Sequence, residues 1–129
     1  MATNPSAFVD CRDQPLRVAK SSVPKPSQDD ITLRTLAVAV DTIDPAQGAG
    51  FQIKQHPAIV GVDLAGDVYE IGINVSRFKR NDHVIRQAWQ LMTGLPEDGA
   101  FSLCSAEFRQ QTLLFCPRKS ATPRVLCFL

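Results

Sequence analysis

The residues that could carry chemistry lie in two turn-like stretches, Asp41–Ala46 (DTIDPA) and Gly61–Asp63 (GVD). Asp and Thr side chains hydrogen-bond to nearby backbone groups, and a proline interrupts regular strand pairing. The first stretch is therefore expected to be a polar turn at the end of a strand. Asp44 and Asp63 are the two carboxylates that could act as catalytic groups. Turn capping at strand ends is the favoured interpretation of both, and direct catalysis is the alternative.

Alternating apolar patterns flank both stretches and predict the strands that position them. Ile31–Val40 alternates large apolar residues with polar or small ones and is rich in β-formers, which predicts a strand. The segment from His56 to Val84 begins with an apolar run that stops at Gly61, and Asp67–Ile71 alternates between two further glycines. Strand, tight turn, polar loop and strand again indicate a compact β-barrel segment.

Length and composition predict one ordinary globular domain. The chain has 129 residues, of which 44% are hydrophobic and 21% charged, with a net charge of +1. This charge gives no global field for nucleic acid, and no apolar run approaches the roughly 20 residues that span a bilayer. The first residues lack the basic and apolar regions of a secretory signal. We therefore expect a cytoplasmic protein with neither a nucleic-acid nor a membrane partner.

The stretch from Pro57 to Val84 follows the pattern P-x-x-x-G-x-D-x-A-G-x-V-x-x-x-G-x-x-V-x-x-F-K-x-x-D-x-V. This pattern resembles the N-terminal, GroES-like catalytic domain of medium-chain dehydrogenases/reductases. It is most similar to the zinc-free quinone oxidoreductase and fungal-type enoyl reductase branch. Gly99–Phe101 also matches the family's G-A-F motif, which opens the next strand. The resemblance implies a mainly β fold, a partly open GroES-like barrel with short helical or irregular segments.

The resemblance also divides the chain into three parts. Residues 1–14 are expected to form an irregular N-terminal lead-in, and residues 15–108 the GroES-like, catalytic-type domain, with a first short strand near Pro15–Lys20. The match fades after about Arg109. Residues 109–129 carry cations and no acidic residue, and we expect them to form a divergent, disordered basic tail.

The family's active-site loop reads N-P-V-D-W-K in the enoyl reductase branch, and this chain departs from it. Asp41 stands in place of Asn, Thr42 in place of Pro and Ala46 in place of Lys, whereas Asp44 is retained. The resemblance implies that Thr42 and Asp44 face the substrate.

Asp63 and Trp89 are the other residues that the resemblance implies on the substrate side. The only tryptophan, Trp89, stands beside a Gly/Pro-rich loop that could form a pocket rim. Packing over the end of the barrel is the favoured alternative for this side chain.

Neither the loop nor the Gly61–Asp63 triplet supplies the ligands that the family's zinc enzymes use. Those enzymes place a Cys where this chain has Asp41, and a His where it has Val62. Catalytic zinc needs three protein ligands. We expect no metal, and we interpret His56 and His83 as surface loop residues.

Family members transfer hydride from NADPH, which is held by a Rossmann domain that follows the GroES-like domain. A strand, a Gly-rich phosphate turn and a helix should then follow one another, and this sequence shows no such pattern. We expect that this chain alone binds no cofactor and is not active alone. The resemblance implies NADPH and an enoyl or quinone substrate for the full-length protein.

Three functional hypotheses follow. The first is a truncated NADPH-dependent enoyl- or quinone-reductase-like oxidoreductase that retains the GroES-like domain. The second is a stand-alone barrel that acts as a binding or interaction module through homo- or hetero-association at its exposed edge, or a non-functional remnant. The third, a co-chaperonin, shares the fold, but the motif match favours the reductase lineage.

Overall fold

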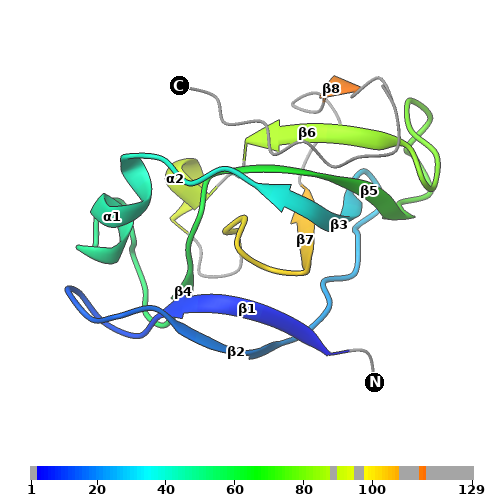
Figure 1. Ribbon diagram of the computed structural model, residues 1–129. Helices are drawn as coiled ribbons and strands as arrows, with labels where there is room; N and C mark the ends of the chain where they lie inside the picture. Colours follow the sequence, from blue (N-terminus) through cyan, green and yellow to red (C-terminus); the bar gives the residue numbers. More distant parts are fainter. Residues whose placement is uncertain (1–2, 88–89, 95–97, 108–113, 116–129) are drawn as a thin grey trace.

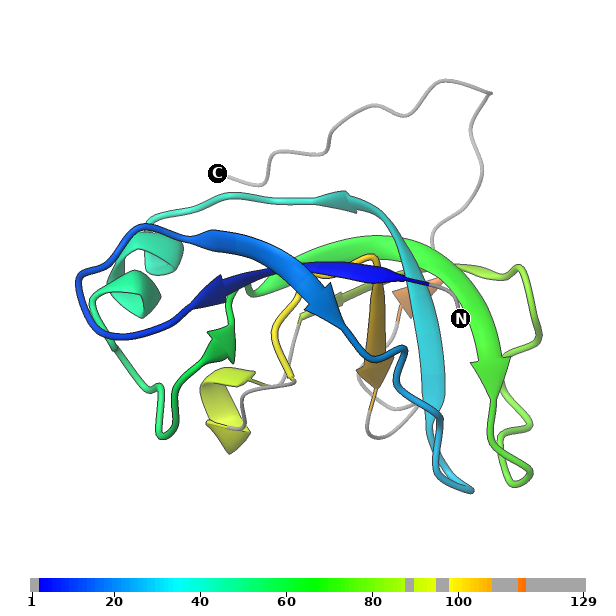
Figure 2. The same cartoon turned by 90° about the horizontal axis from the view of Figure 1, so that it is seen from below.

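The computed structural model describes residues 3–87, 90–94, 98–107 and 114–115. The described chain is mainly β, as the sequence predicts, and its strands form two antiparallel sheets that do not close into a barrel (Figures 1 and 2). The elements, in chain order, are β1 (Asn4–Val9), β2 (Arg17–Ser21), β3 (Ile31–Val38), α1 (Ile43–Gly48), β4 (Ala58–Ile59), β5 (Asp63–Ile71), β6 (His83–Gln87), α2 (Gln90–Thr93), β7 (Cys104–Glu107) and β8 (Leu114–Phe115).

The larger sheet has the strand order β7-β3-β5-β6-β8 and contains the two strands that the sequence predicts most clearly. β3 and β5 run antiparallel, with Ile31 opposite Ile71 and Val38 opposite Leu64. The end of β3 therefore lies beside the start of β5, and the Ala39 amide donates to the Asp63 carbonyl at 3.1 Å. This register brings the turn after β3 close to the Gly61–Asp63 triplet.

The smaller sheet, with the order β2-β1-β4, contains a strand where an irregular lead-in was predicted. Asn4–Val9 forms β1, so this part of the prediction was wrong. Asn4 and Ser6 are buried, and Asn4 exchanges two hydrogen bonds with the Cys104 backbone, at 2.7 and 3.0 Å. Buried polar side chains with backbone partners remove the apolar alternation from which a strand would be recognised.

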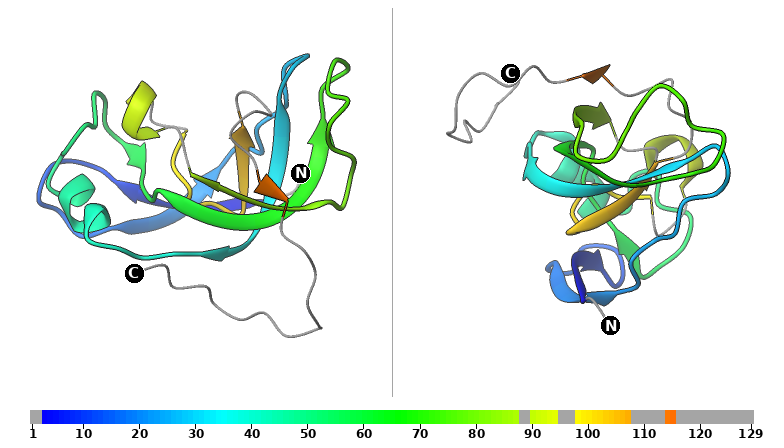
Figure 3. Two further views of the ribbon diagram at one scale, coloured as in Figure 1. Left: turned by 90° about the horizontal axis from the view of Figure 1, so that it is seen from above. Right: turned by 90° about the vertical axis from the view of Figure 1, so that its right-hand side faces the viewer.

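Residues 99–103 connect the two sheets and do not begin the strand expected from the G-A-F motif. The Ala7 amide donates to the Phe101 carbonyl at 2.8 Å, and the Thr35 amide donates to the Leu103 carbonyl at the same distance. The strand itself, β7, begins at Cys104. Figure 3 shows the smaller sheet beside the curved larger one, with this segment between them.

Most of the core comes from the larger sheet and the loop between β5 and β6. Its buried members are Ile31, Leu33, Leu64, Val68, Val75, Phe78, Val84 and Ala100. Among the described residues, neither helix has the length and apolar character required to cross a bilayer.

Candidate functional site

The turn that follows β3 is built from the carboxylates of Asp41 and Asp44. Asp41 Oδ1 accepts a hydrogen bond from the Ile43 amide, and Asp44 Oδ2 accepts one from the Asp41 amide, both at 2.8 Å. These local bonds are of the kind that capping residues make. Thr42 is the residue before α1, and its exposed side chain makes no capping hydrogen bond.

Asp44 keeps one oxygen that local structure does not use. Its Oδ1 is buried and accepts no hydrogen bond from any described residue. A buried carboxylate oxygen without a donor disfavours the charged form of the group. Burial accordingly raises the pKa of Asp44, and the negative charges of Asp41 and Asp63 raise it further. The hydrogen bond from the Asp41 amide acts in the opposite direction and lowers this pKa.

Asp63 lies at the start of β5 with its side chain partly exposed. Burial raises the pKa of this carboxyl as well, and the charge of Asp41 adds to the effect. The charge of Asp41 thus raises the pKa of both Asp44 and Asp63, and the charge of Asp63 also raises the pKa of Asp44. Such a cluster can retain a proton at a higher pH than an isolated carboxylate would.

Gln47 joins the two candidate stretches, although nothing in the sequence pattern distinguishes it. Its side chain is fully buried, and Oε1 accepts a hydrogen bond from the Gly61 amide at 2.8 Å. The bond ties α1 to the turn that leads to Asp63. No apolar periodicity marks this position as buried, since its neighbours are Ala and Gly. A sequence pattern alone could therefore not reveal it.

The Gly61 turn owes its shape to the absence of a side chain. Gly61 has a φ of +96°, and a Cβ at this position would come within 2.2 Å of the Phe101 ring. The Ala100 amide donates to the Gly61 carbonyl at 3.0 Å. The next residue, Val62, is 3% exposed and belongs to the interior. The residue at the family's zinc-histidine position is therefore a packed apolar side chain.

The two histidines differ in their surroundings. His56 is exposed in the loop before β4, as predicted, and its Nδ1 lies 3.5 Å from the Val9 carbonyl oxygen. The prediction for His83 was wrong, because this residue begins β6 and its half-buried ring bonds to Asp67. Asp67 also accepts from Arg34 at 3.2 Å. Cross-strand pairing therefore determines the position of His83.

No group of three or more His, Cys, Asp or Glu side chains in the described ranges is placed to hold a metal ion. Trp89 lies outside the described residues, so its predicted place at a pocket rim stays a prediction.

A pyrophosphate-binding turn would need glycines that open a helix. Gly48 ends α1 and Gly50 follows it, and the described helices have six and four residues. The described residues therefore do not fit a dinucleotide.

Comparisons with known proteins bear on these features. The family model of the alcohol dehydrogenase GroES-like domain matches residues 27–116. A dehydrogenase of Emericella nidulans, orsE, is 40% identical over 104 residues, which are 80% of this chain and 30% of that protein. The chain thus spans about 30% of the length of this curated relative.

Solved structures share the fold. An alcohol dehydrogenase superfamily protein from Novosphingobium aromaticivorans aligns with a TM-score of 0.76 and 25% identity, over 88% of this chain and 34% of that one. A quinone oxidoreductase from Escherichia coli, solved in complex with NADPH, aligns with a TM-score of 0.72 and 18% identity, over 88% of this chain and 33% of that one.

Proposed function

Because the chain belongs to the alcohol dehydrogenase GroES-like domain family of the medium-chain dehydrogenases/reductases, we propose that it forms the substrate-side half of an NADPH-dependent oxidoreductase. The substrate class is an activated double bond, an enone or a quinone, and the enzyme works without zinc. One observation supports this proposal above all. Asp44 and Asp63 lie near each other where β3 ends and β5 begins, and the hydrogen bond between Gln47 and Gly61 links their two segments.

The proposed site residues have separate tasks. Asp44, whose raised pKa accompanies a buried oxygen without a hydrogen-bond donor among the described residues, holds a proton beside the substrate, and Asp63 raises its proton affinity further. Thr42, exposed before α1, contacts the substrate, and Trp89 forms part of the pocket rim. Ala46 leaves the site without the family's lysine, so a carboxyl group replaces a cation as the nearby titratable group.

Zinc independence is supported by the residue types present. Val62, at the position of the zinc-ligating histidine, is packed in the interior, and Asp41 stands at the position of the zinc-ligating cysteine. NADPH supplies a hydride in such enzymes. Since the described residues do not fit a dinucleotide, we assign no hydride-transfer step to them. The proposal is that nucleotide binding is the task of a separate, Rossmann-type domain.

The purified chain and NADPH provide a direct test. A ligand that binds the folded state raises the melting temperature. We expect no shift at about 1 mM NADPH, the upper end of ordinary KM values, and no NADPH oxidation with 9,10-phenanthrenequinone or 2-cyclohexenone. A saturable rise in melting temperature, or NADPH oxidation by the chain alone, would overturn the proposal that a separate domain binds the nucleotide.

Exposed apolar side chains favour a second candidate function, an interaction module. Leu36 and Val40, in and after β3, are 57% and 75% exposed, and Phe51, after α1, is 47% exposed. Apolar surface of this kind often marks association sites. Light scattering coupled to size-exclusion chromatography should then show a concentration-dependent dimer that Val40→Ser and Phe51→Ser together abolish. A monomer at all concentrations would remove homo-association as the function.

A further inference from the structure

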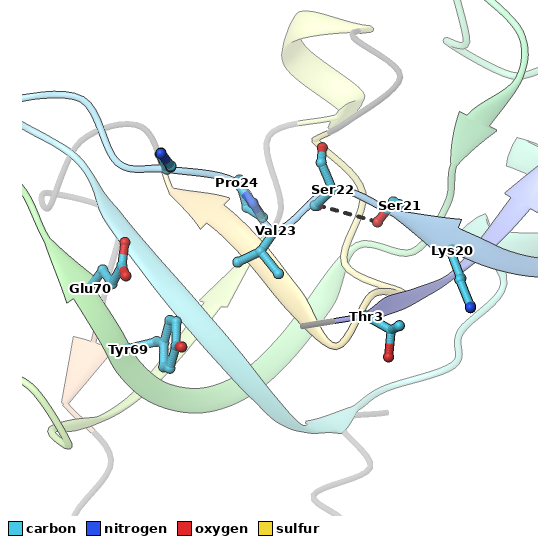
Figure 4. Close-up of a pocket in the computed structure, with 9 residues that line it drawn as sticks. Thr3, Lys20, Ser21, Ser22, Val23, Pro24, Tyr69 and Glu70 are labelled. Carbon is cyan, nitrogen blue, oxygen red and sulfur yellow. Dashed lines mark hydrogen bonds between the residues drawn. The ribbon is translucent and has the colours of Figure 1, made fainter. Parts of the chain in front are cut away.

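A cavity lies at the opposite end of β5 from the candidate site. Its volume is about 580 Å³, and Lys20, Val23, Pro24, Lys25, Tyr69 and Glu70 are among the residues that line it (Figure 4). Six residues of extended strand separate Asp63 from Tyr69, which corresponds to roughly 20 Å. The volume falls within the usual range of small-molecule pockets. This cavity is therefore a candidate binding site distinct from the Asp44–Asp63 cluster.

Buried polar side chains hold one wall of the cavity, the segment that follows β2. Asn4, which is 1% exposed, donates from Nδ2 to the Ser22 carbonyl at 3.0 Å. Thr32, which is fully buried, donates from Oγ1 to the Pro24 carbonyl at 2.9 Å. The wall is consequently anchored to β1 and β3 before any ligand arrives. A preorganised wall reduces the entropy lost on binding.

Tyr69 forms the facing wall because of a bulge in β5. The register passes from Leu33–Val68 to Thr32–Glu70, so that Tyr69 has no direct partner on β3. A bulge of this kind changes the direction in which a side chain points. Figure 4 shows Val23 and the Tyr69 ring on opposite sides of the cavity. An apolar, planar molecule fits between an aromatic ring and an aliphatic side chain.

The charged groups at the cavity indicate the polar part of the ligand. Within the described part of the chain, Lys20, Lys25 and Glu70 form no hydrogen bond or ion pair, so their charged atoms can contact a ligand. Figure 4 shows Lys20 and Glu70 at opposite ends of the opening. Two cations against one carboxylate leave an excess positive charge. That excess favours an acidic group at the Lys20 end of the cavity, away from Glu70, and disfavours a cationic ligand.

We propose that this cavity binds a planar, mainly apolar molecule with one carboxylate or sulfonate group. The apolar body lies between Tyr69 and Val23, and the acidic group contacts Lys20. This binding activity goes beyond the proposed reductase function and does not depend on it, because the residues of the two sites do not overlap.

Two fluorescent probes that differ in charge test the proposal on the full chain. 8-Anilinonaphthalene-1-sulfonate carries a planar apolar body and a sulfonate, and N-phenyl-1-naphthylamine is its counterpart without the sulfonate. We expect saturable binding of the sulfonate probe, about tenfold tighter than that of the neutral one, and an affinity that falls as salt is added. Non-saturable binding, or equal affinity for both probes, would overturn the proposal.

Variants locate the site. Lys20→Ala with Lys25→Ala should remove the advantage of the sulfonate probe and leave the neutral probe unchanged, and Tyr69→Ala should weaken both about tenfold. Both lysines are exposed, so the double variant should fold normally, which circular dichroism verifies. Lys79→Ala, also exposed but outside the cavity, is the matched control and should change nothing. If Lys79→Ala and the double variant behave alike, the cavity is not the binding site.

Discussion

Replacing Gln47 with Met tests the link between the two halves of the candidate site. Met has a similar length and flexibility, so the volume of the buried side chain is nearly retained, but its thioether is only a weak acceptor and does not replace the amide oxygen that accepts from the Gly61 amide. Gly61 is itself buried. The substitution should therefore leave a buried N–H without an acceptor.

The expected loss follows from that unsatisfied donor. Leaving a buried polar group without a partner costs about 1–3 kcal/mol, so we expect the free energy of unfolding to fall by about 2 kcal/mol. With an ordinary urea dependence for a small domain, the unfolding midpoint should fall by about 1 M with an unchanged slope. Hydrogen exchange of the Gly61 amide should accelerate beyond what this global loss explains, since its bond is removed in the native state.

Gln55→Met is the matched control, because Gln55 is exposed in the loop before β4. A surface change of this kind should stay within about 0.5 kcal/mol of the parent chain. If Gln47→Met is equally harmless and Gly61 exchange is unaltered, the bond does not hold the two stretches together, and the reasoning about the site is refuted.

Two further substitutions test the same region. Gly61→Ala combines a strained φ of +96° with a Cβ that would meet the Phe101 ring, so the free energy of unfolding in urea should fall by about 3 kcal/mol. Gly48→Ala, whose Cβ would lie in open space, should leave the free energy of unfolding unchanged. Equal effects of the two glycine changes would be inconsistent with this account. Burial and the charge of Asp41 raise the pKa of Asp63 in the folded state. The Asp63 carboxyl therefore favours folding most at pH values below its unfolded pKa of about 4. This contribution to stability disappears as the pH rises through the folded pKa. Asp63→Asn should therefore stabilise the chain by about 0.5 kcal/mol at pH 7, and the gain should vanish near pH 3; a gain that is independent of pH would contradict the raised pKa.

The strands around the site could be predicted from the sequence because their apolar residues alternate. Ile31–Val38 and Asp63–Ile71 both form strands, and their residues Ile31, Leu33, Leu64 and Val68 are buried, although Leu36 and Ile71 are exposed. β1 could not be predicted, since its buried residues Asn4 and Ser6 are polar, and Asn4 is satisfied by the backbone of Cys104, in a distant part of the chain. Partners that are 100 residues apart leave no local signal.

The candidate site was only partly accessible to the same reasoning. The sequence indicates that Asp44 and Asp63 are carboxylates at strand ends, but the effect of Asp63 on the pKa of Asp44 depends on the β3–β5 register. The role of Gln47 depends on a contact with Gly61 across the fold. Similarly, the direction of the Tyr69 side chain results from a bulge in β5 that could not be predicted from the residue types.

The most direct test of the central claim is the activity of a chimera. Residues 1–107 of this chain would replace the matching N-terminal region of the Emericella nidulans dehydrogenase, whose remaining part would supply the nucleotide-binding half. We predict NADPH oxidation that requires 9,10-phenanthrenequinone or 2-cyclohexenone, is absent from either half alone and falls at least tenfold with Asp44→Asn. A folded chimera that binds NADPH but reduces neither substrate would contradict the claim that this chain forms the substrate side of an oxidoreductase.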